Sequence, residues 1–173
     1  MLGFLCVVWQ TLAQHRTFME HEAYVDAVSN IMEAMIGTGE ITQILLNSSS
    51  DLERALSSPI TQFIYITVRP LHDRHYELLP LIERLKGQLK MVPGCLAYCW
   101  GPCIEQDTVQ VGLVGWNSLH VSGFLKLLVL NEKLRFSQEH DLAIRGPLSK
   151  IIRLIRELSD VQLRYATLAL HGT

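Results

Sequence analysis

Apolar positions along this chain recur with two periods, one typical of strands and the other of helices. Strands are predicted over Leu2–Trp9, Ile41–Leu46, Ile60–Val68, Cys95–Trp100, Thr108–Trp116 and Val161–Leu170. Helices are predicted over Tyr24–Ile36, Tyr76–Leu89 and Leu148–Leu158, with shorter helical segments before Ala55 and over Phe124–Leu134. Pro80 and Pro147 are expected in the first turn of their helices, where a missing amide does little harm.

The order of these elements indicates a repeat. Residues 60–173 are predicted to form strand-helix-strand-strand-helix-strand, the ferredoxin-like order. Residues 1–47 are predicted to form a partial copy, strand-helix-strand, and residues 48–59 a connector. Both copies carry an apolar run that ends in tryptophan, Trp9 or Trp116, followed by a polar turn, a leucine and a phenylalanine. A sheet with helices on one side needs cover on the other, so we predict an α+β fold whose units pack sheet to sheet.

Composition narrows the classes of function. Hydrophobic residues make up 49% of the chain and charged residues 18%, with a formal net charge of -2, which is unlike the basic surface of a nucleic-acid binder. A mean hydropathy of +0.20 predicts apolar surface that meets another chain or roofs a cavity. No run reaches the roughly 18 apolar residues of a membrane span. The segment Leu2–Trp9 lacks the flanks of a signal peptide, and the four cysteines then predict reduced thiols and a cytoplasmic protein.

Three features together resemble the dimeric α+β barrel superfamily, in its antibiotic-biosynthesis-monooxygenase-like branch. They are the strand Ile60–Val68 with its Arg69-Pro70 end, the turn Val92-Pro93-Gly94-Cys95 before a strand, and the two tryptophan phrases. The chain is most similar to tandem, fungal-type members of secondary metabolism, here with a shortened first repeat. The resemblance covers nearly the whole chain. It implies a dimeric α+β barrel, a homo-oligomer (a dimer) and a small hydrophobic or aromatic substrate.

One segment is similar to the phrase that carries the base in polyketide cyclases of this family. It contains Phe18, His21 and Tyr24 at three-residue spacing. An imidazole can take a proton from an acidic carbon or phenol, and a tyrosine hydroxyl can hold the developing oxyanion. His15 is a second candidate base and Tyr98 a second candidate donor. The alternative interpretation is that His21 is an exposed residue at a helix start and Tyr24 a core aromatic residue. For a single histidine this non-catalytic interpretation is the default.

Aromatic residues on predicted strands are candidates for the walls of a substrate pocket, or for a packed core. They are Trp9, Tyr65, Trp100 and Trp116. Gly112 and Gly115 leave space on one predicted strand, which favours a cavity. His72 and His75 are placed at the mouth of that cavity. No metal is predicted, because zinc needs three or four convergent ligands, and the cysteines are expected to be small core side chains.

We therefore predict a cofactor-free tailoring enzyme of secondary metabolism. It would cyclise or isomerise a polyketide- or terpenoid-like substrate by His/Tyr acid–base chemistry. The alternatives are a cofactor-independent monooxygenase acting on an aromatic polyketide, and a non-catalytic ligand-binding or interaction protein. The sequence contains no glycine-rich phosphate loop or dinucleotide fingerprint, in keeping with the prediction that no cofactor is used.

Overall fold

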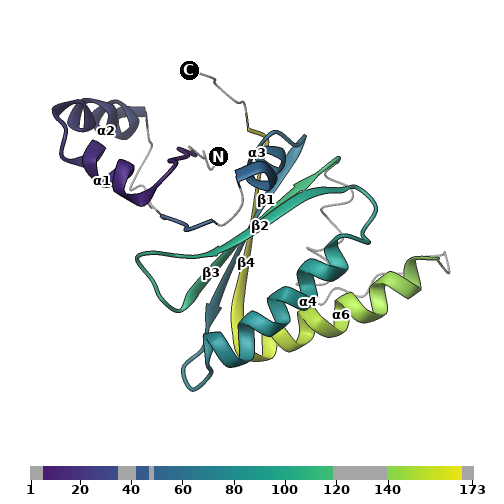
Figure 1. Cartoon of the computed structure of the whole chain (residues 1–173). Coiled ribbons are helices and arrows are strands. Elements are labelled where there is room, and N and C mark those ends of the chain that lie inside the picture. The colour runs from purple at the N-terminus through teal and green to yellow at the C-terminus, as the bar shows by residue number, and fades with distance from the viewer. Residues whose placement is uncertain (1–5, 35–41, 47–48, 119–139, 169–173) are drawn as a thin grey trace. The chain divides into compact units, whose positions relative to one another are not determined.

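The structure, a computed structural model, describes residues 6–34, 42–46, 49–118 and 140–168. The chain forms two compact units, Met1–Ile41 (unit 1) and Thr42–Thr173 (unit 2), and both are drawn in Figure 1. The helix predicted over Phe124–Leu134 lies outside the described residues. The assignment of the chain to a partial and a complete copy of one repeat stays a prediction.

Unit 1 contains two helices, α1 (Leu12–Met19) and α2 (Glu22–Ala34). The second of these agrees with the predicted helix over Tyr24–Ile36. Residues 6–9 form no strand, so the strand predicted over Leu2–Trp9 is wrong in its described part. A strand needs a neighbour for its backbone hydrogen bonds, and no described residue of unit 1 belongs to another strand.

Unit 2 contains a four-stranded antiparallel sheet in the order β2-β3-β1-β4. Its strands are β1 (Ile60–Val68), β2 (Cys95–Pro102), β3 (Val109–Trp116) and β4 (Ser159–Ala166). Its helices are α3 (Ser49–Leu56), the π-helical turn η1 (Arg74–Leu78), α4 (Leu79–Leu89) and α6 (His140–Leu158). This arrangement confirms the α+β class and the ferredoxin-like order.

The core of unit 2 lies between the sheet and two helices. Figure 1 shows α4 and α6 side by side on one face of the sheet. Apolar side chains of β1 pack there against the inward faces of both helices; the buried set includes Ile64, Ile66, Val68, Leu78, Ile82, Leu85, Leu148, Ile151 and Ile155. Pro80 lies in the first turn of α4, as predicted. Pro147 lies inside α6 because that helix begins at His140, so its expected position at a helix start is wrong.

The opposite face of the sheet is partly covered by the same chain. Helix α3 packs against β2 and β3, and the Thr61 hydroxyl donates to the Ala55 carbonyl at 2.9 Å. A Cβ on Gly115 would lie 2.9 Å from the Cα of Ala55, so this glycine permits the close approach of α3. The space that the sequence suggested beside Gly115 is therefore filled by a helix.

A short segment before α3 adds to this cover. Ile44 forms a single antiparallel bridge with Cys103, where a strand was predicted over Ile41–Leu46. The Leu45 carbonyl lies where a Cβ on Gly101 would be, so this close contact also depends on a glycine. The described residues contribute one sheet. No described helix is long and apolar enough to cross a membrane.

Candidate functional site

The predicted residues of unit 1 come together around Trp9. The indole stacks on the His15 ring, with centroids 5.0 Å apart and planes 22° apart. Phe18 lies 5.1 Å from the same indole, and its other side meets Tyr24 edge-on at 5.8 Å. These four half-buried rings, which we call the Trp9 cluster, form a continuous aromatic surface between residue 9 and the start of α2.

A depression opens beside this cluster. It is lined by Trp9, Gln14, Thr17, Phe18 and His21. Gln14, Thr17 and Phe18 are three or four residues apart within α1, which places their side chains on one side of that helix, and His21 follows the end of the helix. Two aromatic rings thus form an apolar wall, and the polar side chains of Gln14, Thr17 and His21 stand next to it.

The two histidines of unit 1 differ in their hydrogen bonds. The Nδ1 atom of His21 accepts the backbone N–H of Ala23 at 3.2 Å. An atom that accepts an N–H carries no proton itself, so the proton of the neutral ring lies on Nε2 and can be donated. The ring nitrogens of His15 have no hydrogen-bond partner among the described residues, which leaves a lone pair free to accept a proton.

Trp116 is fully buried in the sheet of unit 2, and its surroundings include a polar chain that the sequence did not reveal. Its indole N–H donates to Oε1 of Gln62 at 2.8 Å. The Gln62 amide in turn donates to the Tyr165 hydroxyl at 2.9 Å. Burial raises the pKa of Tyr165 to about 12, so this phenol keeps its proton at neutral pH. The sequence feature that could have indicated this polar chain is Gln62, a glutamine on the apolar face of the strand predicted over Ile60–Val68.

The other strand aromatics of unit 2 belong largely to its packed interior. The Trp100 ring lies over Gly112, where a Cβ would come 2.5 Å from its six-membered ring. The space beside Gly112 is therefore filled, contrary to the cavity expected from the sequence. The indole nitrogen of Trp100 is buried without a hydrogen-bond partner among the described residues. Tyr98 is half-buried and packs against the same core.

A small apolar cavity of about 20 Å³ lies between the sheet and the helices of unit 2. It is lined by Ile64, Ile66, Leu85, Ile152, Ile155, Val161 and Leu163. A volume of roughly 10–15 Å³ is the minimum for one water molecule, so this cavity is far smaller than a polyketide-like substrate.

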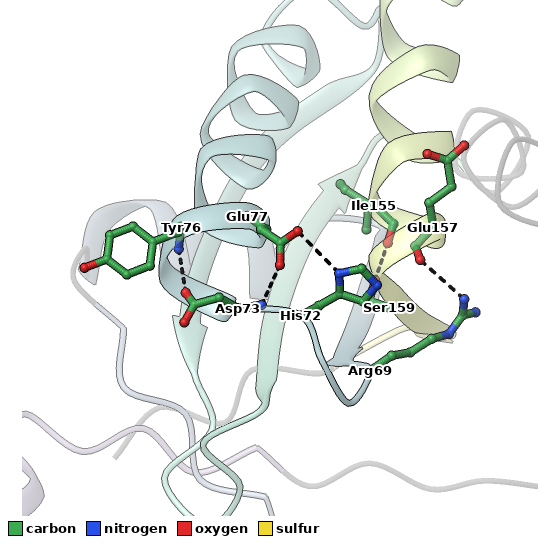
Figure 2. Close-up of polar contacts among 8 residues, drawn as sticks. All are labelled: Arg69, His72, Asp73, Tyr76, Glu77, Ile155, Glu157 and Ser159. Carbon is green, nitrogen blue, oxygen red and sulfur yellow. Dashed lines mark hydrogen bonds and ion pairs between the residues drawn. The ribbon is translucent and has the colours of Figure 1, made fainter.

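His72 and the residues after it build the start of a helix, as Figure 2 shows. The His72 Nδ1 atom lies 3.3 Å from Oε1 of Glu77, whose other oxygen accepts the Asp73 N–H at 2.6 Å. Asp73 accepts the Tyr76 N–H at 2.7 Å, so it caps the helix. The backbone N–H of Asp73, helped by His72, lowers the pKa of Glu77.

Two further residues predicted to bind substrate have local partners of their own. The Nε2 atom of His75 lies 3.2 Å from a guanidinium nitrogen of Arg74. Tyr65 is half-buried on β1, and the guanidinium carbon of Arg164 lies 5.3 Å from its ring centroid. Their role in substrate binding stays a prediction.

The cysteines are free thiols. Burial raises the pKa of Cys95 to about 11 and, with a smaller effect of the Asp51 charge, that of Cys99 to about 12. Both groups are therefore protonated and weakly nucleophilic at neutral pH. Within the described residues, no group of three or more His, Cys, Asp or Glu side chains could hold a metal ion.

No family model matches the sequence, and no curated protein matches it significantly. Similar solved structures include SnoaB from Streptomyces nogalater, a cofactor-independent oxygenase. It is 18% identical over 65% of this chain and 94% of its own, with a TM-score of 0.43. A Fusobacterium nucleatum protein, provisionally assigned as a monooxygenase, is 13% identical over 89% of this chain and 62% of its own, with a TM-score of 0.48. These values describe a likeness of fold alone.

Proposed function

We propose that this chain is a cofactor-free enzyme that removes a proton from a planar, polyketide- or terpenoid-like molecule bound beside the Trp9 cluster. The observation that carries the proposal is the gathering of His15, His21 and three other aromatic rings within one small unit. Flat rings and a few convergent polar groups are what a site for an aromatic ligand requires.

The hydrogen bonds of unit 1 support separate roles for its two imidazoles. Removal of a proton from a carbon beside a carbonyl group moves negative charge to the carbonyl oxygen, so the reaction needs a base and a hydrogen-bond donor. His15, whose ring nitrogens are unpartnered among the described residues, is the base. His21 donates through Nε2 to the oxygen, and Tyr24 supplies a second hydroxyl donor. Attack of the enolate on another carbonyl closes a ring, and its protonation at a different carbon gives an isomer.

Oxygenation is the alternative outcome of the same first step. An electron-rich enolate of an aromatic polyketide can itself reduce molecular oxygen. In that reaction a ring CH₂ group and O₂ give a carbonyl group and water, which accounts for every atom without a cofactor. Oxygen consumption in step with product formation distinguishes this monooxygenase from the cyclase or isomerase.

The packing of unit 2 supports a second candidate function, a ligand-binding or interaction protein without catalysis. Trp100 and Trp116 are buried, and the cavity beneath the helices is about 20 Å³. A protein of this kind would bind a planar ligand beside Trp9 and leave its protons in place.

Proton removal can be tested without knowing the natural substrate. The probe is 2-tetralone, a bicyclic ketone with acidic CH₂ groups, incubated with the full chain in heavy water and analysed by mass spectrometry. We expect catalysed deuterium uptake that falls about 100-fold or more in the His15→Ala, His21→Ala double variant, since general acid–base groups contribute roughly 10²–10⁴-fold. The matched control is the Glu83→Ala, Lys86→Ala variant, which removes an exposed pair on α4. Full exchange by the histidine variant refutes the proposal.

A further inference from the structure

We propose that Gln14 is a specificity-determining residue that makes the depression beside Trp9 accept ring oxygens and reject cations. This inference rests on the proposed function, because it concerns the ligand of the same site. It follows from which polar atoms of two side chains, those of Gln14 and His21, already have backbone partners.

Gln14 is held in place by the start of α1. Its backbone N–H donates to the Thr11 hydroxyl at 3.0 Å, and its side-chain Oε1 accepts the Gln10 backbone N–H at 3.0 Å. This reciprocal arrangement is a variant of the capping box. A backbone N–H can only donate, so the amide oxygen of Gln14 must face it. The amide nitrogen, with its two hydrogens, has no partner among the described residues, and Gln14 lines the depression.

His21, which lies between α1 and α2, is oriented in a similar way. Its Nδ1 accepts the Ala23 N–H, so the neutral ring offers a donor at Nε2. The acceptor atoms of both side chains are thus occupied by backbone groups, and the donor atoms remain for a ligand. Thr17, the third polar residue in the lining, can donate as well as accept, and no carboxylate is among the described residues that line the depression.

This lining, mostly apolar with a few unpartnered donors, defines the chemistry of the ligand. A planar ring can lie against Trp9 and Phe18, and an ionised hydroxyl, a carboxylate or a carbonyl oxygen on its edge can accept from Gln14 and His21. A cationic ring would gain from the same contact with the tryptophan face, but it would meet donor hydrogens where it needs acceptors. The site therefore selects oxygen-bearing rings.

The substitution Gln14→Glu tests this selection with little change in shape. A glutamate carboxylate can still accept the Gln10 N–H, but its second oxygen replaces the donor with a charged acceptor. The matched control is Gln162→Glu, the same change on an exposed part of β4. The probes are 2-naphthoate and 2-naphthylmethylammonium, which share a ring and differ in charge. Binding to the full chain is measured by calorimetric titration.

We expect the unaltered chain and the Gln162→Glu control to bind naphthoate about tenfold or more tightly than the ammonium probe, the typical effect of a charge-assisted hydrogen bond. Gln14→Glu should reverse that order. Gln14→Met, which removes the donor without adding charge, should weaken naphthoate binding and leave ammonium binding unchanged. Equal binding of both probes to the unaltered chain, or an unchanged preference in Gln14→Glu with normal helix content, overturns the inference.

The outcome is separable from that of the proposed function. If naphthoate preference follows Gln14 but 2-tetralone gains no deuterium, the chain is an oxygen-selecting binding protein and the catalytic proposal fails. If deuterium exchange depends on His15 and His21 but the preference for naphthoate does not change in the Gln14 variants, the proposed reaction is supported and the role of Gln14 in specificity is refuted.

Discussion

The buried chain Trp116–Gln62–Tyr165 predicts that replacing a polar core residue by an apolar one will destabilise the protein. Gln62 and Trp116 are both fully buried, and the Gln62 oxygen is the acceptor of the indole N–H at 2.8 Å. In Gln62→Leu the side chain keeps a similar size and loses both polar atoms. Hydrophobic transfer alone would favour this change, but it leaves the indole N–H buried without an acceptor.

The size of the destabilisation follows from the indole N–H that is left without an acceptor. An unsatisfied buried hydrogen-bonding group costs about 1–3 kcal/mol, and this cost applies to the fully buried indole N–H more than to the half-buried Tyr165. We therefore expect Gln62→Leu to lower the free energy of unfolding by about 1–3 kcal/mol. In a Trp116→Phe background there is no indole N–H to strand, so the same substitution should cost less there. The coupling between the two positions should be about 1 kcal/mol or more.

The assay is urea unfolding of the four proteins of this double-mutant cycle, followed by circular dichroism. Comparable slopes of free energy against urea would show that the unfolded states are alike. Tyr165→Phe is the companion variant, expected to couple to Gln62 more weakly because Tyr165 is only half-buried. Additive effects of Gln62→Leu and Trp116→Phe, or a gain in stability from Gln62→Leu alone, would show that the hydrogen-bonded chain does not hold the core as argued.

Three further predictions test other parts of unit 2. Gly115→Ala should lower the free energy of unfolding by about 1–3 kcal/mol, because it forces α3 away from the sheet. Gly87→Ala, in an exposed helix position with open space, should raise the free energy of unfolding by about 0.5–1 kcal/mol. The check is urea unfolding, in which the two variants should shift the midpoint in opposite directions. Leu71 is fully exposed with a φ of 76°, so Leu71→Gly should raise the melting temperature by relieving about 1 kcal/mol of backbone strain. Tyr165 has its pKa raised from about 10 to about 12, so its contribution to stability is present below pH 10 and lost as the pH rises through 12. The drop in urea midpoint over that range should be smaller in Tyr165→Phe.

Much of unit 2 could be predicted because its elements are marked locally. The alternation from Ile60 to Val68, ended by Arg69-Pro70, gives the observed bounds of β1. Such local sequence patterns predict the bounds less well where a helix extends beyond the residue that is typical of a helix start. The sequence predicts a helix start at Pro147, but α6 begins at His140. Its missing amide interrupts a hydrogen bond without ending a helix that packs against α4.

Features that depend on the register between strands could not be predicted from the sequence. Gly112 suggested an empty space, but Trp100 lies opposite it across the hairpin and fills that space. A sequence does not say which cross-strand neighbour a glycine will have. The run before Trp9 was similarly ambiguous, because apolar character favours a strand only where a partner strand is within reach. The role of Gln14 could not be predicted from the sequence, because its unpartnered donor depends on two hydrogen bonds at the start of α1 that no sequence pattern indicates.

The two tryptophan phrases of this chain show how far a repeated pattern determines chemistry. Trp116 ends a strand, lies beneath two helices, and gives its N–H to a buried glutamine, so every part of its ring is used by the fold. Trp9 follows a run that forms no strand in its described part, remains half-buried, and stacks on His15. Unit 1 has no counterpart of Gln62 among its described contacts. The same residue type is therefore a structural element in unit 2 and an accessible aromatic surface in unit 1. This difference is the physical reason for proposing that the chemistry takes place at Trp9.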